Sequence, residues 1–253
     1  SFYRARQSRA PHLAILAAAI HLHAPLTCQA LAHGAYVLCE KPLCASLPEA
    51  RQMQAAEQRA GRWVAVGYQW SFSAPIQALK GDILAGQLGR PLRLKTLVLW
   101  PRLRSYYRRN DWAGKIRTSQ GAWVLDSPAH NAAAHYLHNM LYLLGDQPAL
   151  SAWPVDVQAE KYRANEIENY DAIALRSHTA QGVEILFYAA HCVAEESGPI
   201  LQYEFERAVV TYRPGQEGGF VAQFPDGSLR SYGDPTPDEA GKIWRSLDAM
   251  RSQ

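Results

Sequence analysis

The chain has 253 residues, of which 48% are hydrophobic and 19% charged, and its formal net charge is +3. A sizeable core can form, so the composition excludes a disordered chain, and the small charge gives no support for nucleic-acid binding. No stretch reaches the ~18 apolar residues that a membrane helix requires, because the run LAILAAAI over 13–20 is too short.

The first 70 residues alternate between patterns of buried strands and helices. Apolar runs of strand length are separated by segments with helical spacing, and the second of these carries an N-cap serine, Ser46, and ends at Gly61. The expected order is strand 13–19, helix 24–34, strand 35–40, helix 46–61 and strand 62–68. A β-α-β-α-β order with short connections predicts a parallel sheet flanked by helices.

A polar turn follows each of these strands. Glu40-Lys41-Pro42 comes directly after the second strand, and Gly67-Tyr68-Gln69 ends the third. Because right-handed crossovers place the carboxyl ends of parallel strands at one edge, the turns should converge there. Open parallel sheets bind ligands at that edge, so chemistry is expected there.

After residue 73 the helices are set apart from a run of strands. The expected elements are helices 74–86 and 131–146, strands 90–101, 155–163, 170–179, 183–192 and 201–213, and a hairpin with an Asp-Gly turn over 224–229. This order predicts an α+β domain on a large, mostly antiparallel, open-faced sheet. We therefore expect two domains, 1–73 and 74–253.

The segment HLHAPLTCQALAHGAYVLCEKPLCASLPEARQM, 21–53, resembles the middle of the nucleotide-binding domain of the Gfo/Idh/MocA family, whose signature is Glu-Lys-Pro after a strand. The segment VLDSPAHNAAAHYLHNMLYLLG, 124–145, resembles the substrate-side helix of the same family. The resemblance implies an α/β fold in which a partial Rossmann-type parallel sheet, dinucleotide-binding over 1–73, precedes the α+β substrate and oligomerisation domain over 74–253.

Two features depart from the family pattern. Family members begin with a strand, a Gly-rich G-x-G-x-x-G turn and a helix, whereas SFYRARQSRAPH precedes the first strand here. A βαβ unit takes ~30 residues, so we expect this chain to lack the pyrophosphate cradle and to bind dinucleotide poorly by itself. The family's Thr-Pro before the segment HLHA is also replaced, by Ala18-Ala19-Ile20.

The resemblance assigns roles to the Glu-Lys-Pro turn. Lys41 corresponds to the catalytic lysine, a residue type that serves as a base when burial and nearby cations lower its pKa. Glu40 would lie near the cofactor ribose, and Pro42 would fix the turn, with a cis peptide bond as one way to do so. His23 occupies a position that often holds a histidine near the cofactor. A plain surface turn is the alternative for Lys41.

Two pairs fit the family's D-x-x-x-H pattern for a second proton-handling group. Asn131 and His135 are preferred, because His135 lies ten residues before Gly145 as the family register requires. Asp126 and His130 are the second choice. Asn131 cannot hold the charge of a histidine as an aspartate does. A zinc site at His130, His135 and His138 has no HExxH-type glutamate to support it, so no metal is expected.

Two further residues are candidates for contacts with the cofactor. Gln69 lies in the polar turn after the third strand, and Trp112 belongs to an aromatic group that also contains Trp70, Trp100, Tyr106 and Tyr107. Such rings can cover a nicotinamide, stack on a sugar or pack in the core. Arg108 and Arg109 are candidates for holding a hydroxylated or acidic substrate, although exposed loop arginines are common.

The resemblance implies an NAD- or NADP-dependent oxidoreductase that transfers a hydride to or from a sugar, cyclitol or related polyol. The alternative is a non-catalytic fragment or pseudo-enzyme that serves as an oligomerisation or interaction domain. In both cases we expect a homo-oligomer that forms through an apolar face of the open sheet, and neither nucleic acid nor membrane as a partner. The four cysteines lack CxxC spacing, which favours free thiols and a cytoplasmic protein.

Overall fold

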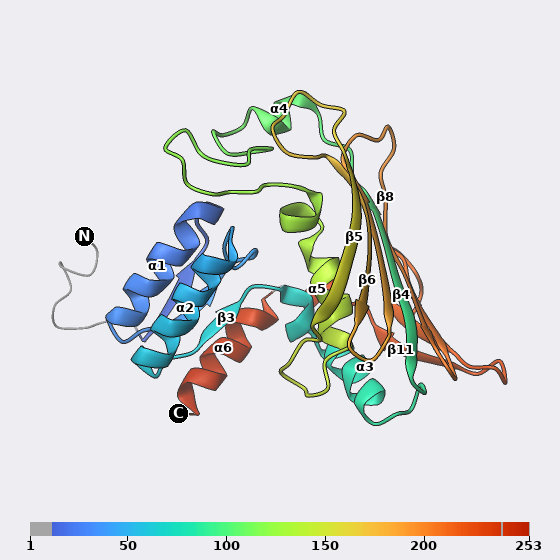
Figure 1. The fold of residues 1–253 in the computed structure, drawn as a ribbon. Helices are drawn as coiled ribbons and strands as arrows, with labels where there is room; N and C mark the ends of the chain where they lie inside the picture. Colours follow the sequence, from blue (N-terminus) through green and yellow to red (C-terminus); the bar gives the residue numbers. More distant parts are fainter. Residues whose placement is uncertain (1–11, 239, 253) are drawn as a thin grey trace. The chain divides into compact units, whose positions relative to one another are not determined.

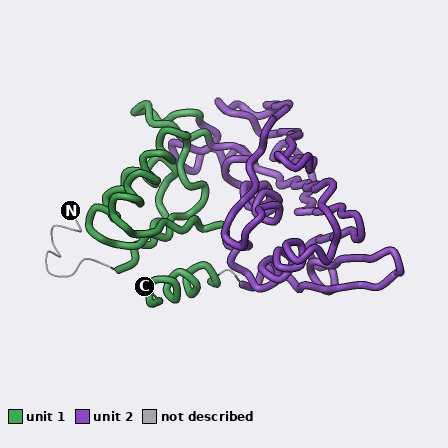
Figure 2. The backbone as a smooth tube through the Cα atoms, turned by 60° about the horizontal axis from the view of Figure 1, so that its bottom comes forward, with its two compact units in different colours: residues 1–68, 116–125, 240–253 green, residues 69–115, 126–239 purple. Residues whose placement is uncertain are grey.

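The computed structural model describes residues 12–238 and 240–252. Two compact units make up the chain (Figure 2), and each is described by itself. Unit 1 comprises residues 1–68, 116–125 and 240–253, and unit 2 comprises 69–115 and 126–239. The sequence shows no Gly-rich turn in the segment before the first strand. Most of that segment, residues 1–11, lies outside the described part, so the structure does not address this prediction.

Unit 1 contains the predicted parallel sheet. Its strands β1 (Leu13–Leu16), β2 (Tyr36–Cys39) and β3 (Val64–Val66) lie in that order, and both neighbouring pairs are parallel. Helices α1 (Ile20–Ala32) and α2 (Leu47–Ala60) connect the strands, and the C-terminal helix α6 (Gly241–Arg251) contacts β2 (Figure 1). Every residue of β2 is buried, so the strand forms the centre of this core.

The start of α2 is fixed by its own side chains. The Glu49 carboxylate accepts hydrogen bonds from the backbone N–H groups of Ser46 and Ala45, both at 3.0 Å, which satisfies amides that a helix start leaves free. Gly61 ends the helix in the left-handed conformation, with φ of 59°. These contacts hold the backbone shortly after the Glu40-Lys41-Pro42 turn.

Unit 2 is built on one eight-stranded sheet. The strands are β4 (Pro91–Leu99), β5 (Pro154–Tyr162), β6 (Ala172–Thr179), β7 (Glu184–Ala190), β8 (Ser197–Phe205), β9 (Val209–Tyr212), β10 (Phe220–Gln223) and β11 (Leu229–Gly233). Their spatial order is β11-β10-β9-β8-β4-β7-β6-β5, and only β4 and β7 pair in parallel. This sheet confirms the predicted mostly antiparallel, open-faced architecture.

One face of the large sheet forms the core of unit 2. Helices α3 (Ala74–Leu84) and α5 (Ala134–Leu143) lie on this face (Figure 1), together with the short helix η2 (Gln69–Phe72). Trp70, in η2, is 5% exposed and makes edge contacts with the rings of Tyr136, Tyr212 and Phe220. Of the aromatic residues noted in the sequence, Trp70 is therefore a core residue.

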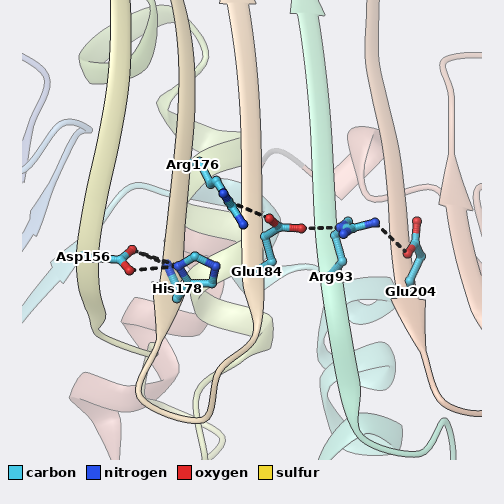
Figure 3. A network of polar contacts seen from close by, with 6 residues as sticks. All are labelled: Arg93, Asp156, Arg176, His178, Glu184 and Glu204. Carbon is cyan, nitrogen blue, oxygen red and sulfur yellow. Dashed lines mark hydrogen bonds and ion pairs between the residues drawn. The ribbon is translucent and has the colours of Figure 1, made fainter.

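The other face of this sheet carries a row of charged side chains rather than the purely apolar surface that the sequence suggests. Glu184 contacts both Arg93 and Arg176, and Arg93 also reaches Glu204 (Figure 3). His178 and Asp156 form a further pair at 2.9 Å. Alternating side chains of the strands point to opposite faces, so the same strands supply the apolar core and this polar row. Exposed pairs of this kind contribute little to stability, because solvent and salt screen them.

Several predicted elements differ in extent, among them the first helix, which begins at Ile20 and not at residue 24. The segment 201–213 forms two strands, β8 and β9, because the intervening turn is held by distant backbone: the N–H groups of Glu206 and Arg207 donate to the carbonyls of Arg90 and Leu88. The helix expected over 131–146 is preceded by a separate wide turn, η3 (Pro128–Ala132), whose start is capped by the Ser127 hydroxyl. The Asp-Gly hairpin is confirmed between β10 and β11.

A buried lysine holds the end of α5. Lys80 in α3 is 1% exposed, and its ammonium donates to the carbonyl oxygens of Tyr142 at 2.7 Å and Leu150 at 2.5 Å. It also lies 3.9 Å from the centre of the Tyr142 ring. Burial lowers the pKa of Lys80 to about 8. The carbonyls at the end of α5 and in the following loop thus have a donor where the helix offers none.

Candidate functional site

The Glu40-Lys41-Pro42 turn lies at the carboxyl end of β2, as the sequence predicts. The Glu40 N–H donates to the Leu16 carbonyl at 2.8 Å, and the Gly67 N–H donates to the Cys39 carbonyl at 2.7 Å. These bonds tie the turn to the ends of both neighbouring strands. The Lys41–Pro42 peptide bond is cis, one of the ways in which Pro42 was expected to fix the turn. Lys41 is half-buried at this edge of the parallel sheet.

The His23 side chain supports this turn through contacts of both ring nitrogens. Its side chain is 1% exposed, with Nδ1 2.7 Å from the Pro42 carbonyl oxygen and Nε2 3.0 Å from the Ala18 carbonyl oxygen. Carbonyl oxygens only accept hydrogen bonds, and a neutral imidazole has one N–H, so His23 donates to one of these oxygens and contacts the other, which places it between the two strand-end loops. His23 therefore holds the backbone of the turn that carries Lys41.

Glu40 has a partner that the sequence did not indicate. Its carboxylate forms an ion pair with the ammonium group of Lys242, in the first turn of α6 and 202 positions away, and also accepts the Lys41 N–H at 3.3 Å. The Lys242 side chain is 13% exposed and that of Glu40 29%, so the pair is partly shielded from solvent. Gly67 faces the carboxylate, because a Cβ there would lie 2.9 Å from Oε2. The carboxylate is held between α6 and the end of β3.

In unit 2 the two candidate pairs of the D-x-x-x-H pattern are joined to each other. Asp126 is 3% exposed, and its carboxylate accepts hydrogen bonds from the Asn131 amide and the Gly114 N–H, both at 2.7 Å. Asn131, which takes the aspartate position in the preferred pair, is thus bound to the aspartate of the other pair. The buried Asp126 carboxylate is thus satisfied by hydrogen bonds, as buried polar groups in folded proteins usually are.

The three histidines of this region lie in different environments. His130 is in the turn η3, and its N–H donates to the Ser127 hydroxyl at 3.3 Å. His135 is the second residue of α5, with its ring 6.5 Å from that of Tyr136. His138, one turn further, contacts the Ser71 hydroxyl at 3.3 Å and stacks on the Tyr142 ring. Burial, and secondarily the charge of Lys80, lowers the pKa of His138 to about 4.

His138 should make the protein less stable in mild acid. Its pKa is about 4 in the folded protein, against 6.5 for an unperturbed histidine such as that of the unfolded chain. As the pH falls, the unfolded chain therefore binds a proton at His138 at a higher pH than the folded protein does. The stability that neutral His138 contributes above pH 6.5 is therefore lost as the pH falls towards 4. Urea unfolding at pH 7.5 and 4.5 should show a loss that is about 2 kcal/mol smaller in His138→Gln than in wild type. Equal losses in both proteins would show that His138 is not the responsible group.

Gln69 and Trp112, the other two cofactor candidates, belong to unit 2. Gln69 opens helix η2 and is half-buried. Trp112 donates its backbone N–H to the Asn110 side chain at 3.1 Å, and the Arg109 guanidinium lies 5.4 Å from its ring. Within each unit the structure thus brings candidates together: His23, Glu40, Lys41 and Pro42 in unit 1, and Asp126 with Asn131 in unit 2.

Metal-binding clusters and membrane-spanning helices are both absent from the described part of the chain. Across 12–238 and 240–252, no group of three or more His, Cys, Asp or Glu side chains is arranged to hold a metal ion. Within the same ranges, no helix has both the length and the apolar composition needed to cross a bilayer.

Comparison with known proteins points to a nucleotide-binding family, in agreement with a Glu-Lys-Pro turn at the end of a parallel strand. A family model described as an oxidoreductase family with an NAD-binding Rossmann fold, GFO_IDH_MocA, matches residues 4–68. Inositol 2-dehydrogenase 4 of Saccharopolyspora erythraea is 30% identical over 219 residues, which are 82% of this chain and 59% of that relative. The chain belongs to the Gfo/Idh/MocA family.

Other matches support this Gfo/Idh/MocA assignment. The 1,5-anhydro-D-fructose reductase of Ensifer adhaerens is 30% identical over 131 residues, or 51% of this chain and 36% of the reductase. The chain thus spans 36% to 59% of these two curated relatives. The WlbA dehydrogenase of Bordetella pertussis, solved with NADH and UDP-GlcNAcA, shares the fold with a TM-score of 0.75 at 20% identity, over 99% of this chain and 68% of that one.

Within this Gfo/Idh/MocA fold, sequence reasoning missed Lys242. No motif surrounds it, and the only local signal is its place in an amphipathic helix near the end of the chain. The role of Tyr170 was also missed: it accepts a hydrogen bond from the Ser127 hydroxyl at 3.0 Å, at the start of η3. Both are long-range contacts, which a local pattern cannot encode.

Proposed function

We propose that the protein is an NAD(P)-dependent oxidoreductase that transfers a hydride to or from a sugar, cyclitol or related polyol. The observation that carries the proposal is the Glu40-Lys41-Pro42 turn, fixed at the carboxyl edge of a parallel sheet in a Gfo/Idh/MocA family member. The relatives named above reduce 1,5-anhydro-D-fructose or oxidise inositol, as their names state. Their substrates are polyhydroxylated rings, which supports the substrate class.

The residues at this edge fit a nicotinamide dinucleotide. Glu40 presents a partly exposed carboxylate, whose oxygens accept hydrogen bonds such as those of ribose hydroxyls. Lys41 and Pro42 continue from it at the strand end, the position where open parallel sheets bind such ligands. When bound, the dinucleotide supplies the hydride chemistry, while the protein binds, orients and handles protons.

Lys41 is the proposed proton-handling group. An alcohol loses its hydroxyl proton as its hydride leaves, and an amine in the neutral form can take that proton. In the reverse direction, the ammonium form donates it. His23 and the strand-end hydrogen bonds fix the backbone around Lys41, so the amine is presented from a rigid turn rather than a mobile loop.

His135 is the proposed substrate-side histidine, and Asn131 and Asp126 its supporting groups, with His130 as the second choice. The support is the hydrogen bond between Asn131 and Asp126, which sets both side chains at the start of α5. Gln69 and Trp112 are proposed to contact the cofactor from unit 2. These roles rest on the family register together with that local geometry.

Lys242 is proposed to hold the Glu40 carboxylate in place for the cofactor. Replacing it as Lys242→Met removes the ion pair while keeping an unbranched side chain of similar length. We expect the dissociation constant for NADH, measured by fluorescence titration, to rise about tenfold, and Lys242→Arg to restore most of the affinity. The matched control is Arg245→Gln, an exposed cation of the same helix. If Lys242→Met binds NADH as the control does, Lys242 has no such role.

The experiment that tests the proposed function is a titration of the purified protein with NADH and NADPH, followed by assays with myo-inositol and 1,5-anhydro-D-fructose. Because the pyrophosphate cradle is expected to be missing, we expect weak but saturable binding of at least one dinucleotide, and its oxidation or reduction in the presence of a polyol or its ketone. Absence of binding by both dinucleotides would contradict the proposal.

We further propose a homo-oligomer that uses the open face of the large sheet, in a cytoplasmic protein. The face combines the charged row with exposed apolar side chains such as Tyr162, Tyr188 and Val209, which are 58%, 39% and 37% exposed. All four cysteines are free thiols, which agrees with a reducing compartment. Sedimentation velocity should show an oligomer that Tyr188→Glu weakens.

A further inference from the structure

Unit 2 contains a cavity of about 400 Å³. Its lining residues are far from Lys41 in the sequence. It is lined by Arg104, Tyr107, Arg108, Ala113, Gly114, Lys115 and residues 165–168. Its size falls in the range of small-molecule sites. All of its lining residues belong to unit 2.

Two arginines of this cavity have no carboxylate partner among the described residues. Arg93 and Arg176 on the sheet are paired with carboxylates, and Lys115 in the cavity is paired with Glu168 at 2.9 Å. Among residues 12–238 and 240–252, the Arg104 and Arg108 guanidinium groups have no such partner. Of their neighbours, Arg102 and Arg109 lie over aromatic rings. The two remaining arginines of 102–109 are therefore available to a ligand.

The wall between these arginines supplies a second observation. Tyr107 lies in helix α4 (Arg104–Tyr107), and its hydroxyl is buried without a hydrogen-bond partner in the described part of the chain. Gly114 lies directly against the ring, because a Cβ at this position would lie 2.9 Å from the ring Cδ1. A buried hydroxyl without a partner costs free energy, which a ligand or water bound beside it would recover.

The cavity adjoins the proton-handling candidates of the same unit. Gly114, in its wall, donates to the Asp126 carboxylate, and the Asn169 amide donates to the Asp126 carbonyl at 3.0 Å. A smaller hollow continues from Tyr107 and Gly114 to Asp126, Ser127 and Pro128. A molecule in the cavity thus lies next to the segment that carries Asn131.

We propose that this cavity binds the anionic substituent of the substrate, a carboxylate or phosphoryl group carried by a sugar-like ring. Guanidinium groups donate several hydrogen bonds in a planar fork that matches both anions. The exposed Glu166 carboxylate, also among the lining residues, can accept hydrogen bonds from the hydroxyls of the ring. This inference names the substrate class of the proposed oxidoreductase and rests on that function for its catalytic meaning.

The test is calorimetric titration without cofactor, at low ionic strength, of the protein with D-glucuronate, D-glucose 6-phosphate and D-glucose. We expect at least one acidic sugar to bind about tenfold or more tightly than D-glucose. The double variant Arg104→Gln/Arg108→Gln should lose this preference, and Arg213→Gln, an exposed arginine of the same unit, should keep it. The tighter of the two acidic sugars identifies carboxylate or phosphoryl recognition.

The outcomes separate this inference from the proposed function. If NADH binds but neither acidic sugar is preferred over D-glucose, the anionic site is wrong and the oxidoreductase stands. If the preference exists but survives the double variant, the assignment to this cavity is wrong. If the arginine-dependent preference is present and no dinucleotide binds, the cavity is supported and the proposed function fails.

Discussion

Lys41→Met is expected to lower turnover by about 10²–10⁴-fold, the usual contribution of a positioned acid or base. Methionine keeps much of the side-chain volume and removes the amine, so the turn should still fold around the cis Lys41–Pro42 bond. Steady-state assays with the best polyol substrate give the rate, and fluorescence titration should give a dissociation constant for NADH within a few-fold of wild type. Circular dichroism checks the fold.

The variant Lys41→Arg distinguishes a role of Lys41 in proton transfer from a role as a positive charge alone. Arginine retains the positive charge but does not give up its proton in proteins, so a base role predicts that this variant is as inactive as Lys41→Met. The control is Lys95→Met, on the open face of the large sheet. Substantial activity of Lys41→Arg would show that the site needs a cation there and not a base.

Gly145→Ala is expected to cause a large loss of stability. Gly145 follows α5, and a Cβ at this position would lie 1.8 Å from the Leu150 carbonyl oxygen, which belongs to backbone. The same oxygen accepts a hydrogen bond from buried Lys80. The loop must move and pull away from that ammonium, so urea unfolding should show a loss of about 3 kcal/mol or more.

Gly81→Ala provides the matched control in the same unit. Gly81 lies inside α3, and nothing is within 4 Å of the position its Cβ would take. Alanine has a higher helix propensity, so this variant should gain about 0.5–1 kcal/mol in the free energy of unfolding. If Gly145→Ala is no less stable than Gly81→Ala, the tight approach of Leu150 to Gly145 is not a feature of the protein.

The parts of the fold that sequence could predict are those encoded by local patterns. The buried strand β2, the N-cap Ser46 with Glu49 and the stop at Gly61 each carry their signal within one turn or one strand. From the order of these elements, the parallel sheet and the position of its carboxyl edge followed directly. The Asp-Gly hairpin between β10 and β11 was predictable for the same reason.

The parts that escaped prediction depend on contacts between distant segments. The turn at 206–208 contains neither glycine nor proline, and its position is set by hydrogen bonds to residues 88–90. The partner of Glu40 comes from α6, at the other end of the chain, and the carboxylate of Asp126 bonds to Gly114 and Asn131 across a turn. The residues of the candidate site were proposed from the sequence, whereas the contacts that hold them could not be predicted from it.

A crystal structure of the protein with NAD⁺ and myo-inositol tests the role of Lys41 most directly. We predict the Lys41 Nζ at hydrogen-bond distance, roughly 2.6–3.2 Å, from the reacting hydroxyl, with the imidazole of His135 or His130 on the substrate as well. A Lys41 ammonium that points into bulk solvent, remote from the substrate and both histidines, would contradict the proposed mechanism.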